Sequence, residues 1–172
     1  MEVQEQEGFD MFRLMAKPRA HQQISEEECV RILKEQKRGI LCVLGDEGYP
    51  YGTPTNHFYN EEDGKLYFHS NKKGHKVDAM KACDKVCFVC YDEGYRKEGD
   101  WALNIKSVIV FGRVEFVDYE TDPERFTRIM TDLSHKFTDD EAYIAKEMKT
   151  AAGTLLFAIR PEHMTGKLVN ES

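Results

Sequence analysis

The stretch with the clearest potential for chemistry is HSNKKGHK at residues 69–76, which holds three lysines, two histidines and one glycine. Ammonium groups, hydroxyl and amide donors, and the close backbone approach that glycine allows together suit a bound anion such as phosphate. A solvated lysine-rich turn would have the same composition. The stretch therefore predicts either a phosphate-binding loop or an ordinary exposed turn.

This loop is expected to lie between a strand and a helix. The run LYFHS before it has an extended pattern, and HKVDAMKA at residues 75–82 places Val77 and Met80 on one side of a short helix. The first turn of a helix presents unpaired backbone N–H groups, which bind anions. The candidate ligands are Ser70, Asn71, Lys72, Lys73 and Lys76.

The rest of the chain alternates extended runs with turn signals. Asp-Glu-Gly at residues 46–48 and Glu-Asp-Gly at residues 62–64 predict successive antiparallel hairpins. SVIVFGRVEFVDY at residues 107–119 predicts one long strand, or two strands joined by a kink at Gly112. GTLLFAI at residues 153–159 predicts the last strand, with RPEHMTGK following it.

The order of these elements predicts a mainly β protein of the α+β kind, a six-stranded antiparallel barrel with peripheral helices. We expect one domain over residues 1–172, in which residues 1–23 form a poorly patterned arm. Three further helices have start signals, namely Ser25 with Glu28, Asp122 with Pro123, and Thr138 with Glu141.

Composition limits the partners and the compartment. The 172 residues include 24 Lys and Arg against 31 Asp and Glu, a formal net charge of −7. This charge argues against nonspecific binding to nucleic acid or to an anionic membrane surface, so a bound anion needs a local site. The sequence has neither an apolar run of membrane-spanning length nor a signal-peptide pattern at its start, and we expect a cytoplasmic protein.

Cysteines and common nucleotide motifs do not provide an alternative site. Cys87 and Cys90 have a two-residue spacing, but on the strand predicted for KVCFVCY they would point to opposite faces, which disfavours a metal site. The sequence has no Walker loop, GxGxxG motif or Gly-x-Ser-x-Gly elbow. We expect free thiols in a reducing compartment from the odd set Cys29, Cys42, Cys83, Cys87 and Cys90.

Two segments, YPYGTPTNHFYNEEDGKLYFHSNKKGHKVDA and NIKSVIVFGRVEFV, resemble the pyridoxamine-phosphate-oxidase-related flavoproteins. The similarity is closest to the branch that contains the nitroimidazole-resistance proteins. It extends from about Met11 to Lys167 and includes MFRLMAKP, ISEEECVRILKEQKRGILCVLGDEGYPY and EHMTGK. The resemblance implies a split β-barrel that binds flavin mononucleotide (FMN) at the interface of a homodimer, with two equivalent sites.

The resemblance also implies roles for individual residues around the flavin ring. His69 and Ser70 would flank the ring and the ribityl chain. His57 shares a face with Thr55, but a structural role facing solvent or the dimer partner fits it equally well, and no catalytic role is assigned to it. One edge of the isoalloxazine ring would be lined, largely through backbone groups, by Thr53, Pro54, Thr55 and Asn56.

The flavin phosphate would be held by both subunits. Lys106 and Ser107 of the partner subunit would approach it, and Trp101 would either cover the flavin from the second subunit or pack in the interface. Where the family usually has arginine, this sequence has Lys106, which keeps the charge but loses the bidentate fork. The contacts from the first subunit would come from Asn71, Lys72, Lys73 and Lys76.

These implications predict a flavin-dependent oxidoreductase that reduces nitroaromatic or quinone-like small molecules with a nicotinamide donor. Such an enzyme needs no side chain as acid or nucleophile, because the cofactor supplies the redox chemistry. Oxidation of pyridoxamine phosphate itself is disfavoured, since RPEHMTGKLVNES offers only Arg160 and Lys167 for a second phosphate.

The main alternative function is a flavin- or haem-binding carrier or sensor without turnover. Haem would require an axial histidine in an apolar pocket, which makes it the weaker cofactor hypothesis. FAD is the alternative flavin, since a site that is open at one edge could accommodate the adenylate. A third hypothesis is a degenerate barrel that only dimerises.

Overall fold

The computed structural model describes residue 12 and residues 17–170. Most of the predicted N-terminal arm, residues 1–23, therefore lies outside the described residues. The part of the arm that is described contains the 3-10 helix η1 (Lys17–Gln22). None of the described helices is both long and apolar enough to cross a membrane.

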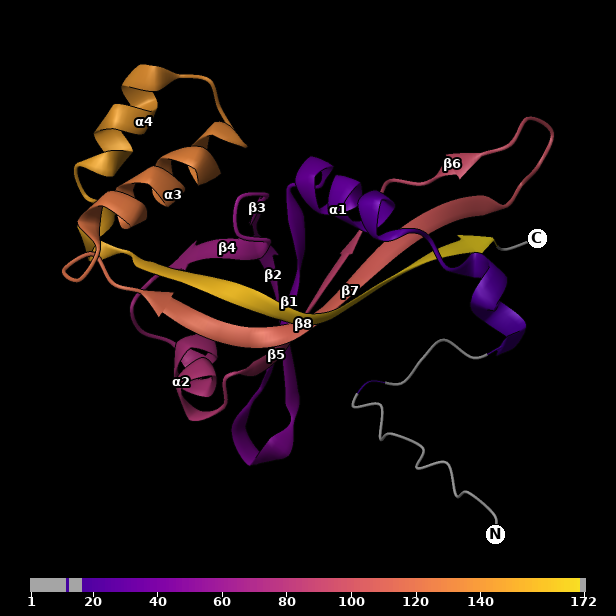
Figure 1. The fold of residues 1–172 in the computed structure, drawn as a ribbon, viewed down its shortest axis with the longest axis horizontal. Helices are drawn as coiled ribbons and strands as arrows, with labels where there is room; N and C mark the ends of the chain where they lie inside the picture. Colours follow the sequence, from indigo (N-terminus) through magenta and orange to yellow (C-terminus); the bar gives the residue numbers. More distant parts are fainter. Residues whose placement is uncertain (1–11, 13–16, 171–172) are drawn as a thin grey trace, which may run out of the picture.

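One antiparallel sheet, with the strand order β2-β1-β5-β7-β8-β4-β3, forms the body of the protein, and β6 pairs with β7 beside it (Figure 1). Six strands have six residues or more, whereas β3 and β6 have three and two. The strands are β1 (Arg38–Leu44), β2 (Pro50–Asn56), β3 (Phe58–Asn60), β4 (Lys65–Ser70), β5 (Lys85–Tyr91), β6 (Tyr95–Arg96), β7 (Leu103–Val117) and β8 (Leu155–Asn170).

The sheet curls into a barrel that is split between its two edge strands. β2 and β3 end the strand order and are not paired with each other among the described strands. The predicted six-stranded antiparallel split barrel is confirmed, with β3 and β6 as short additions. Peripheral helices accompany it, namely α1 (Glu26–Glu35), α2 (His75–Ala82), α3 (Pro123–His135) and α4 (Glu141–Met148), together with the 3-10 turns η2 (Asp46–Gly48) and η3 (Ala151–Gly153).

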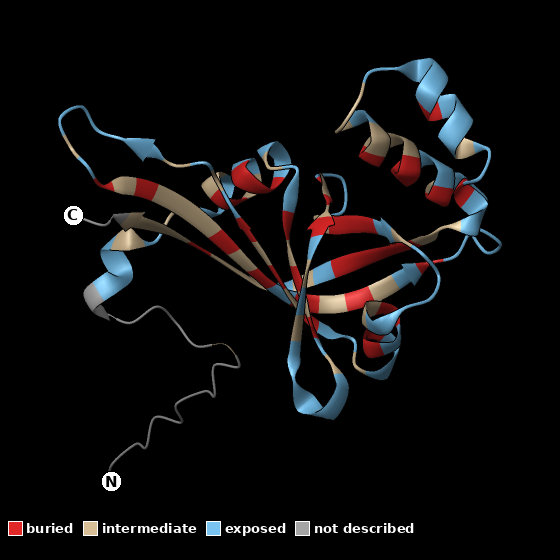
Figure 2. Ribbon diagram, turned by 180° about the vertical axis from the view of Figure 1, so that it is seen from behind, coloured by how far each residue is buried: buried red, intermediate tan, exposed pale blue. Residues whose placement is uncertain are grey.

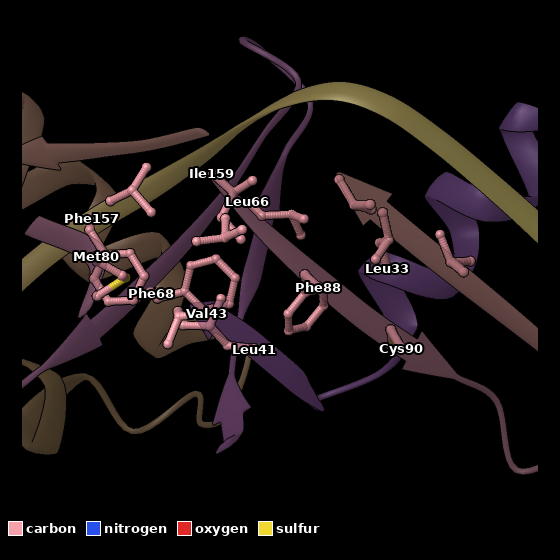
Figure 3. Close-up of a cluster of buried hydrophobic side chains, with 14 of the residues drawn as sticks. Leu33, Leu41, Val43, Leu66, Phe68, Met80, Phe88, Cys90, Phe157 and Ile159 are labelled. Carbon is pink, nitrogen blue, oxygen red and sulfur yellow. The ribbon is translucent and has the colours of Figure 1, made fainter. Parts of the chain in front are cut away.

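Large apolar side chains fill the interior of the curled sheet (Figure 3). Phe68 stacks on Phe157 with ring centroids 5.1 Å apart and meets Phe88 edge-on at 5.2 Å. Leu33 of α1 and Met80 of α2 belong to the same cluster, although the two helices lie on opposite sides of the crossing strands in Figure 1. Both helices therefore close the barrel core.

A second apolar cluster holds α3 against the outer face of β4 and β8. Because successive residues of a strand point to opposite faces, Tyr67 leaves the barrel interior that Leu66 and Phe68 occupy. Tyr67 packs instead with Phe126 and Ile129 of α3. Where both faces are covered, β4 and β8 are buried at consecutive positions, whereas β1 and β5, with one face on the core, alternate between buried and less buried residues (Figure 2).

Most of the expected helix starts are confirmed, and one is wrong. The Ser25 side chain accepts the N–H of Glu28, and the Asp122 side chain accepts the N–H of Arg125 ahead of α3. Thr138 is not the N-cap of α4. Asp140 takes that place, because its carboxylate accepts the N–H of Tyr143 while the Thr138 hydroxyl accepts the N–H of Asp140.

The last strand is longer than its sequence pattern indicates. We expected it to end at residue 159, but β8 runs on to Asn170. The extension pairs with the first half of β7, from Arg113 opposite Arg160 to Asn104 opposite Asn170. Pairing between residues far apart in the sequence thus overrides the proline and glycine signals in RPEHMTGK.

Gly112 is the irregular point of the long β7–β8 ladder. β7 is one continuous strand, and its register with β8 shifts between Phe111 and Gly112. A Cβ atom at Gly112 would lie 2.4 Å from the carbonyl oxygen of Arg160. The kink position predicted from the sequence is thus a bulge, at which only glycine fits without a backbone shift.

We expect Gly112→Ala to lower the free energy of unfolding by about 1–3 kcal/mol, because the new methyl group overpacks the bulge. Urea denaturation monitored by circular dichroism would measure the change. Gly153→Ala is the matched control, since a Cβ there meets nothing within 4 Å. Equal midpoints for the two variants would contradict this account of the bulge.

Candidate functional site

The residues predicted to hold a cofactor fall into two groups that lie apart in the chain (Figure 1). The first group sits at the ends of β2 and β4 and at the start of α2. The second group, Trp101, Lys106 and Ser107, sits on the arm formed by β6 and the first half of β7. The two groups lie on different elements of one chain, and the role of the second group at a partner's site stays a prediction.

β2 carries four of the predicted residues and is an edge strand of the sheet. An edge strand leaves one row of backbone N–H and C=O groups without a strand partner, and such groups can hydrogen-bond a planar ligand. Thr55 is buried and its hydroxyl donates to the carbonyl of Thr53, at 3.1 Å. The Thr53 hydroxyl is itself buried without a hydrogen-bond partner among the described residues.

Asn56 ends β2 with its side-chain amide held in a defined orientation. Arg38 Nε donates to Asn56 Oδ1 at 3.0 Å. Because a guanidinium group can only donate, this contact fixes the amide oxygen toward Arg38 and leaves the NH₂ group free to donate elsewhere. Asn56 and His69 of β4 line the same cavity, of about 330 Å³, beside α3 and α4.

His69 and Lys76 carry the electrostatic signature of this region. Partial burial and then repulsion from the Lys76 ammonium lower the pKa of His69. Burial also lowers the pKa of Lys76, which is the second residue of α2. A bound anion would reverse both effects, since a nearby opposite charge favours the charged form. The pair is therefore suited to an anionic ligand.

The loop before α2 is open and ends in a glycine at the start of the helix. Gly74 is the N-cap of α2 with φ 132°, a conformation that other residues rarely adopt, and a Cβ there would meet nothing within 4 Å. The N-cap provides no side-chain hydrogen bond. Lys73 is exposed, while Lys72 Nζ donates to the carbonyl oxygen of Ala152 at 2.9 Å.

Neighbouring aromatic and acidic groups position the start of α2. The His75 ring packs on Tyr51 with centroids 4.2 Å apart, and its Nε2 lies 3.5 Å from the Asp46 carboxylate. Tyr51 belongs to β2, so this contact ties the phosphate-loop candidate to the strand that carries Thr53 and Asn56. The two parts of the first group are thus held in one unit.

The second group is only partly available within one chain. Trp101 is 70% exposed. Lys106 forms an ion pair with Glu28 of α1, which also binds Arg31 at 2.8 Å, and the hydrogen bonds from Arg31 and Lys106 lower the pKa of Glu28 to about 2. Ser107 lies on the opposite face of β7, because adjacent strand residues alternate. Lys106 would have to leave Glu28 to reach a phosphate.

His57 is a structural residue in the interior, and the expectation that it faces solvent or a partner is wrong. It is 0% exposed, and its Nε2 lies 2.8 Å from the carbonyl oxygen of Leu33, at the end of α1. Lys136 Nζ donates to the same carbonyl at 3.0 Å. Burial, followed by repulsion from Lys136, lowers the pKa of His57 to about 3.

The sequence matches the family model described as pyridoxamine 5'-phosphate oxidase over residues 25–168. The chain belongs to the pyridoxamine 5'-phosphate oxidase family. No curated protein matches the sequence. The matched region includes both parts of the first group of site residues, namely the end of β2 and the loop before α2.

Solved structures share the fold of this family member at low sequence identity. A proposed 5-nitroimidazole antibiotic resistance protein from Bacteroides thetaiotaomicron is 22% identical, with TM-score 0.70 over 86% of this chain and 87% of that one. An FAD-binding protein from Mesorhizobium loti is also 22% identical, with TM-score 0.62 over 86% and 96%. A flavocytochrome from Azotobacter vinelandii is 19% identical, with TM-score 0.61 over 84% and 67%.

Sequence reasoning missed the wall of the cavity that α3 and α4 supply. Met130, Leu133 and Phe137 recur at helical spacing in the sequence, and all three line this cavity. Ser134 and Glu147 line it too and carried no recognisable motif. The only signal in the sequence was the position of the two predicted helices, now α3 and α4, directly before the last strand.

His57 is expected to make the free energy of unfolding depend on pH. Its folded pKa of about 3 lies below the value of about 6.5 for an unfolded histidine, so protonation favours unfolding. The stabilisation is complete above pH ~6.5 and is lost as the pH falls toward 3. Between pH 8 and 5 the loss is about 2 kcal/mol.

Urea unfolding of the wild type and of His57→Gln at pH 8 and 5 would measure this dependence. For His57→Gln, the change in the free energy of unfolding between pH 8 and 5 is expected to be smaller than for the wild type by the contribution of His57. His21→Gln replaces an exposed histidine and should keep the wild-type slope. A His57→Gln variant with the full wild-type dependence on pH would show that the buried ring is not its source.

Proposed function

We propose that this chain binds FMN and acts as a flavin-dependent oxidoreductase on nitroaromatic or quinone-like small molecules, with a nicotinamide donor. The observation that carries the proposal is the open anion site at Gly74 and Lys76, next to Asn56 and His69. Family membership supports it, and so do the fold neighbours described as FAD-binding proteins from Mesorhizobium loti and Mycobacterium smegmatis.

The residues present fit a flavin phosphate and ring. The start of α2 offers unpaired N–H groups beside Lys73 and Lys76, and Gly74 leaves space above them. The free edge of β2 and the Asn56 amide offer donors and acceptors to a planar ring. FMN would place its phosphate at the start of α2 and its ring along the free edge of β2. FAD would bind in the same way and extend its adenylate out of the open edge of the site.

A bound flavin would supply the redox chemistry. The chain's own residues would bind the phosphate through Lys73 and Lys76 and orient the ring along β2. The NH₂ group of Asn56 would donate to an oxygen or nitrogen at the edge of the ring, where donors stabilise added electrons. The barrel side chains behind Thr55 keep water from that side of the strand.

We propose a homodimer because the outer face of the sheet presents an apolar row that a second copy can cover. The row crosses five strands in register, and Val108 and Val110 on the other face of β7 show by their burial that Ile109 points outward. Phe111, two residues after Ile109 on β7, is stacked on Phe12 with ring centroids 5.6 Å apart. The row consists of Pro54, Ile40, Val89, Ile109 and Thr165.

A two-fold partner on this face would also supply the second group of residues. Ser107 lies on the outer face with the row, and the exposed Trp101 extends beyond it on the arm. Each subunit would then complete the site of the other. Lys106 would contact the phosphate only if its ion pair with Glu28 were broken.

Haem is disfavoured because His69, the one described histidine that lines the cavity beside α3 and α4, is assigned here to the flavin. A haem carrier needs a histidine that faces an apolar pocket. His57 is the only fully buried histidine among the described residues, and its Nε2 is already engaged with Leu33. We therefore propose a flavin and not haem as the cofactor.

Lys76→Gln is expected to weaken FMN binding about 10- to 100-fold, because a charge-assisted contact to phosphate contributes about 1.5–3 kcal/mol. Fluorescence titration of the apoprotein would measure the affinity. Riboflavin, which lacks the phosphate, should bind the wild type and the variant equally. Lys81→Gln removes the same charge from the far end of α2 and should leave the FMN affinity unchanged. Equal FMN affinities for the two variants would contradict the phosphate assignment.

Ile109→Arg is expected to convert a dimer to a monomer and to lower the FMN content of the purified protein, since it buries an unpaired charge in the proposed interface. Sedimentation velocity and the visible absorption spectrum would measure the two effects. Phe116→Arg, at an exposed position near the other end of β7, is the control. A dimer that survives Ile109→Arg would place the interface elsewhere.

A further inference from the structure

The cavity beside α3 and α4 has properties that go beyond holding a flavin. It has a volume of about 330 Å³, at the lower end of the range for small-molecule sites, and suits a molecule of one or two rings. Its two sheet residues, Asn56 and His69, are also proposed flavin neighbours, so the cavity opens onto the proposed ring site. It is thus placed where a substrate would meet the cofactor.

The wall opposite the sheet combines apolar and aromatic side chains with the polar side chains of Ser134, Thr138 and Thr150. The aromatic side chains favour a planar ring, and methionine adapts to rings of different outline. The Met148 sulfur lies 3.5 Å from the Thr131 hydroxyl oxygen, whose proton is donated to the carbonyl of Thr127 at 2.8 Å. The apolar and aromatic residues of the wall are Met130, Leu133, Phe137, Tyr143, Met148 and Ala151.

Charge is distributed unequally around the cavity. No lysine or arginine is among the described residues that line it. Glu147 of α4 is exposed at its rim, and its carboxylate forms no ion pair with a described residue. His69 is the other ionisable group apart from the Tyr143 phenol, and partial burial, followed by repulsion from Lys76, lowers its pKa.

We infer that this cavity receives the organic substrate, and that Glu147 selects aromatic molecules that are cationic or uncharged over anionic ones. The inference rests on the proposed function and narrows its substrate class. The lysines of the proposed phosphate site, Lys73 before α2 and Lys76 in its first turn, do not line the cavity, so the anionic cofactor and the acidic rim occupy different places. A phosphorylated substrate would find no cation in the cavity and would be repelled at its rim.

Three nitroaromatic probes of similar shape test the selection, namely the cationic 4-nitrobenzylamine, the neutral 4-nitrobenzyl alcohol and the anionic 4-nitrobenzoate. Calorimetry with the full-length protein, with and without FMN, would measure their affinities at neutral pH and low ionic strength. We expect the cation to bind about two- to fivefold more tightly than the anion, as an exposed charge pair allows. The ratio should fall toward one in high salt.

Glu147→Gln is expected to remove the preference, while Glu141→Gln, which neutralises an exposed carboxylate on the same helix outside the lining, should keep it. Ser134→Phe tests the location, because it fills the cavity from α3 and should abolish binding of all three probes without loss of FMN. A preference that survives Glu147→Gln, or probe binding that survives Ser134→Phe, would overturn the inference.

These outcomes are separable from those of the proposed function. A protein that binds no FMN but still selects cationic probes would overturn the flavin proposal and support the cavity assignment. A protein that binds FMN and shows no difference between the three probes would leave the flavin proposal standing and overturn this inference.

Discussion

The ladder between β7 and β8 is the constraint on which the rest of the structure depends. It pairs the two longest strands from Asn104 opposite Asn170 to Val117 opposite Leu156, with one irregularity at Gly112. One half of the ladder forms the barrel wall, and the other half forms the arm that carries Ser107 (Figure 1). The register shift at Gly112, beside the carbonyl of Arg160, lies between these two halves.

The connection between these two strands explains the position of the cavity. α3 and α4 lie between the end of β7 and the start of β8, so the ladder returns them to one end of the sheet. β4 pairs with β8 at that end, with His69 opposite Leu156. α3 and α4 therefore line one cavity together with Asn56 and His69, which come from much earlier in the sequence. In this way the proposed substrate-binding residues lie next to the proposed flavin-binding residues.

Burial lowers the pKa of three basic side chains, His57, His69 and Lys76, in two different settings. His57 stays neutral in the interior because burial disfavours its charged form, and it links the end of α1 to Lys136 after α3. The lowered pKa values of His69 and Lys76 have a different meaning, since both lie at the surface near an open helix start. The Nε2 of His57 is engaged by the carbonyl oxygen of Leu33, whereas its buried Nδ1 has no partner among the described residues. For His69 and Lys76, an added anion would favour the charged forms.

Much of the fold could be predicted from local patterns. Alternation and turn residues indicated the antiparallel barrel, Ser25 and Asp122 marked two helix starts, and Gly112 marked the irregular point of β7. These features depend on a few neighbouring residues, and local sterics and hydrogen bonding decide them. The candidate phosphate loop could be found for the same reason, because its glycine, lysines and helix start are contiguous.

Other features were decided only by tertiary structure. The extension of β8 depends on β7 more than 40 residues away, the capture of Lys106 by Glu28 depends on α1 packing against the arm, and the burial of His57 depends on α1 and α3 closing over it. The cavity likewise joins Asn56 and His69 to Glu147 across the sheet and the helices. By itself the sequence determined most of the strands and helices and the position of the candidate anion-binding loop. It could not determine which distant side chains would meet, because those contacts form only when the elements pack.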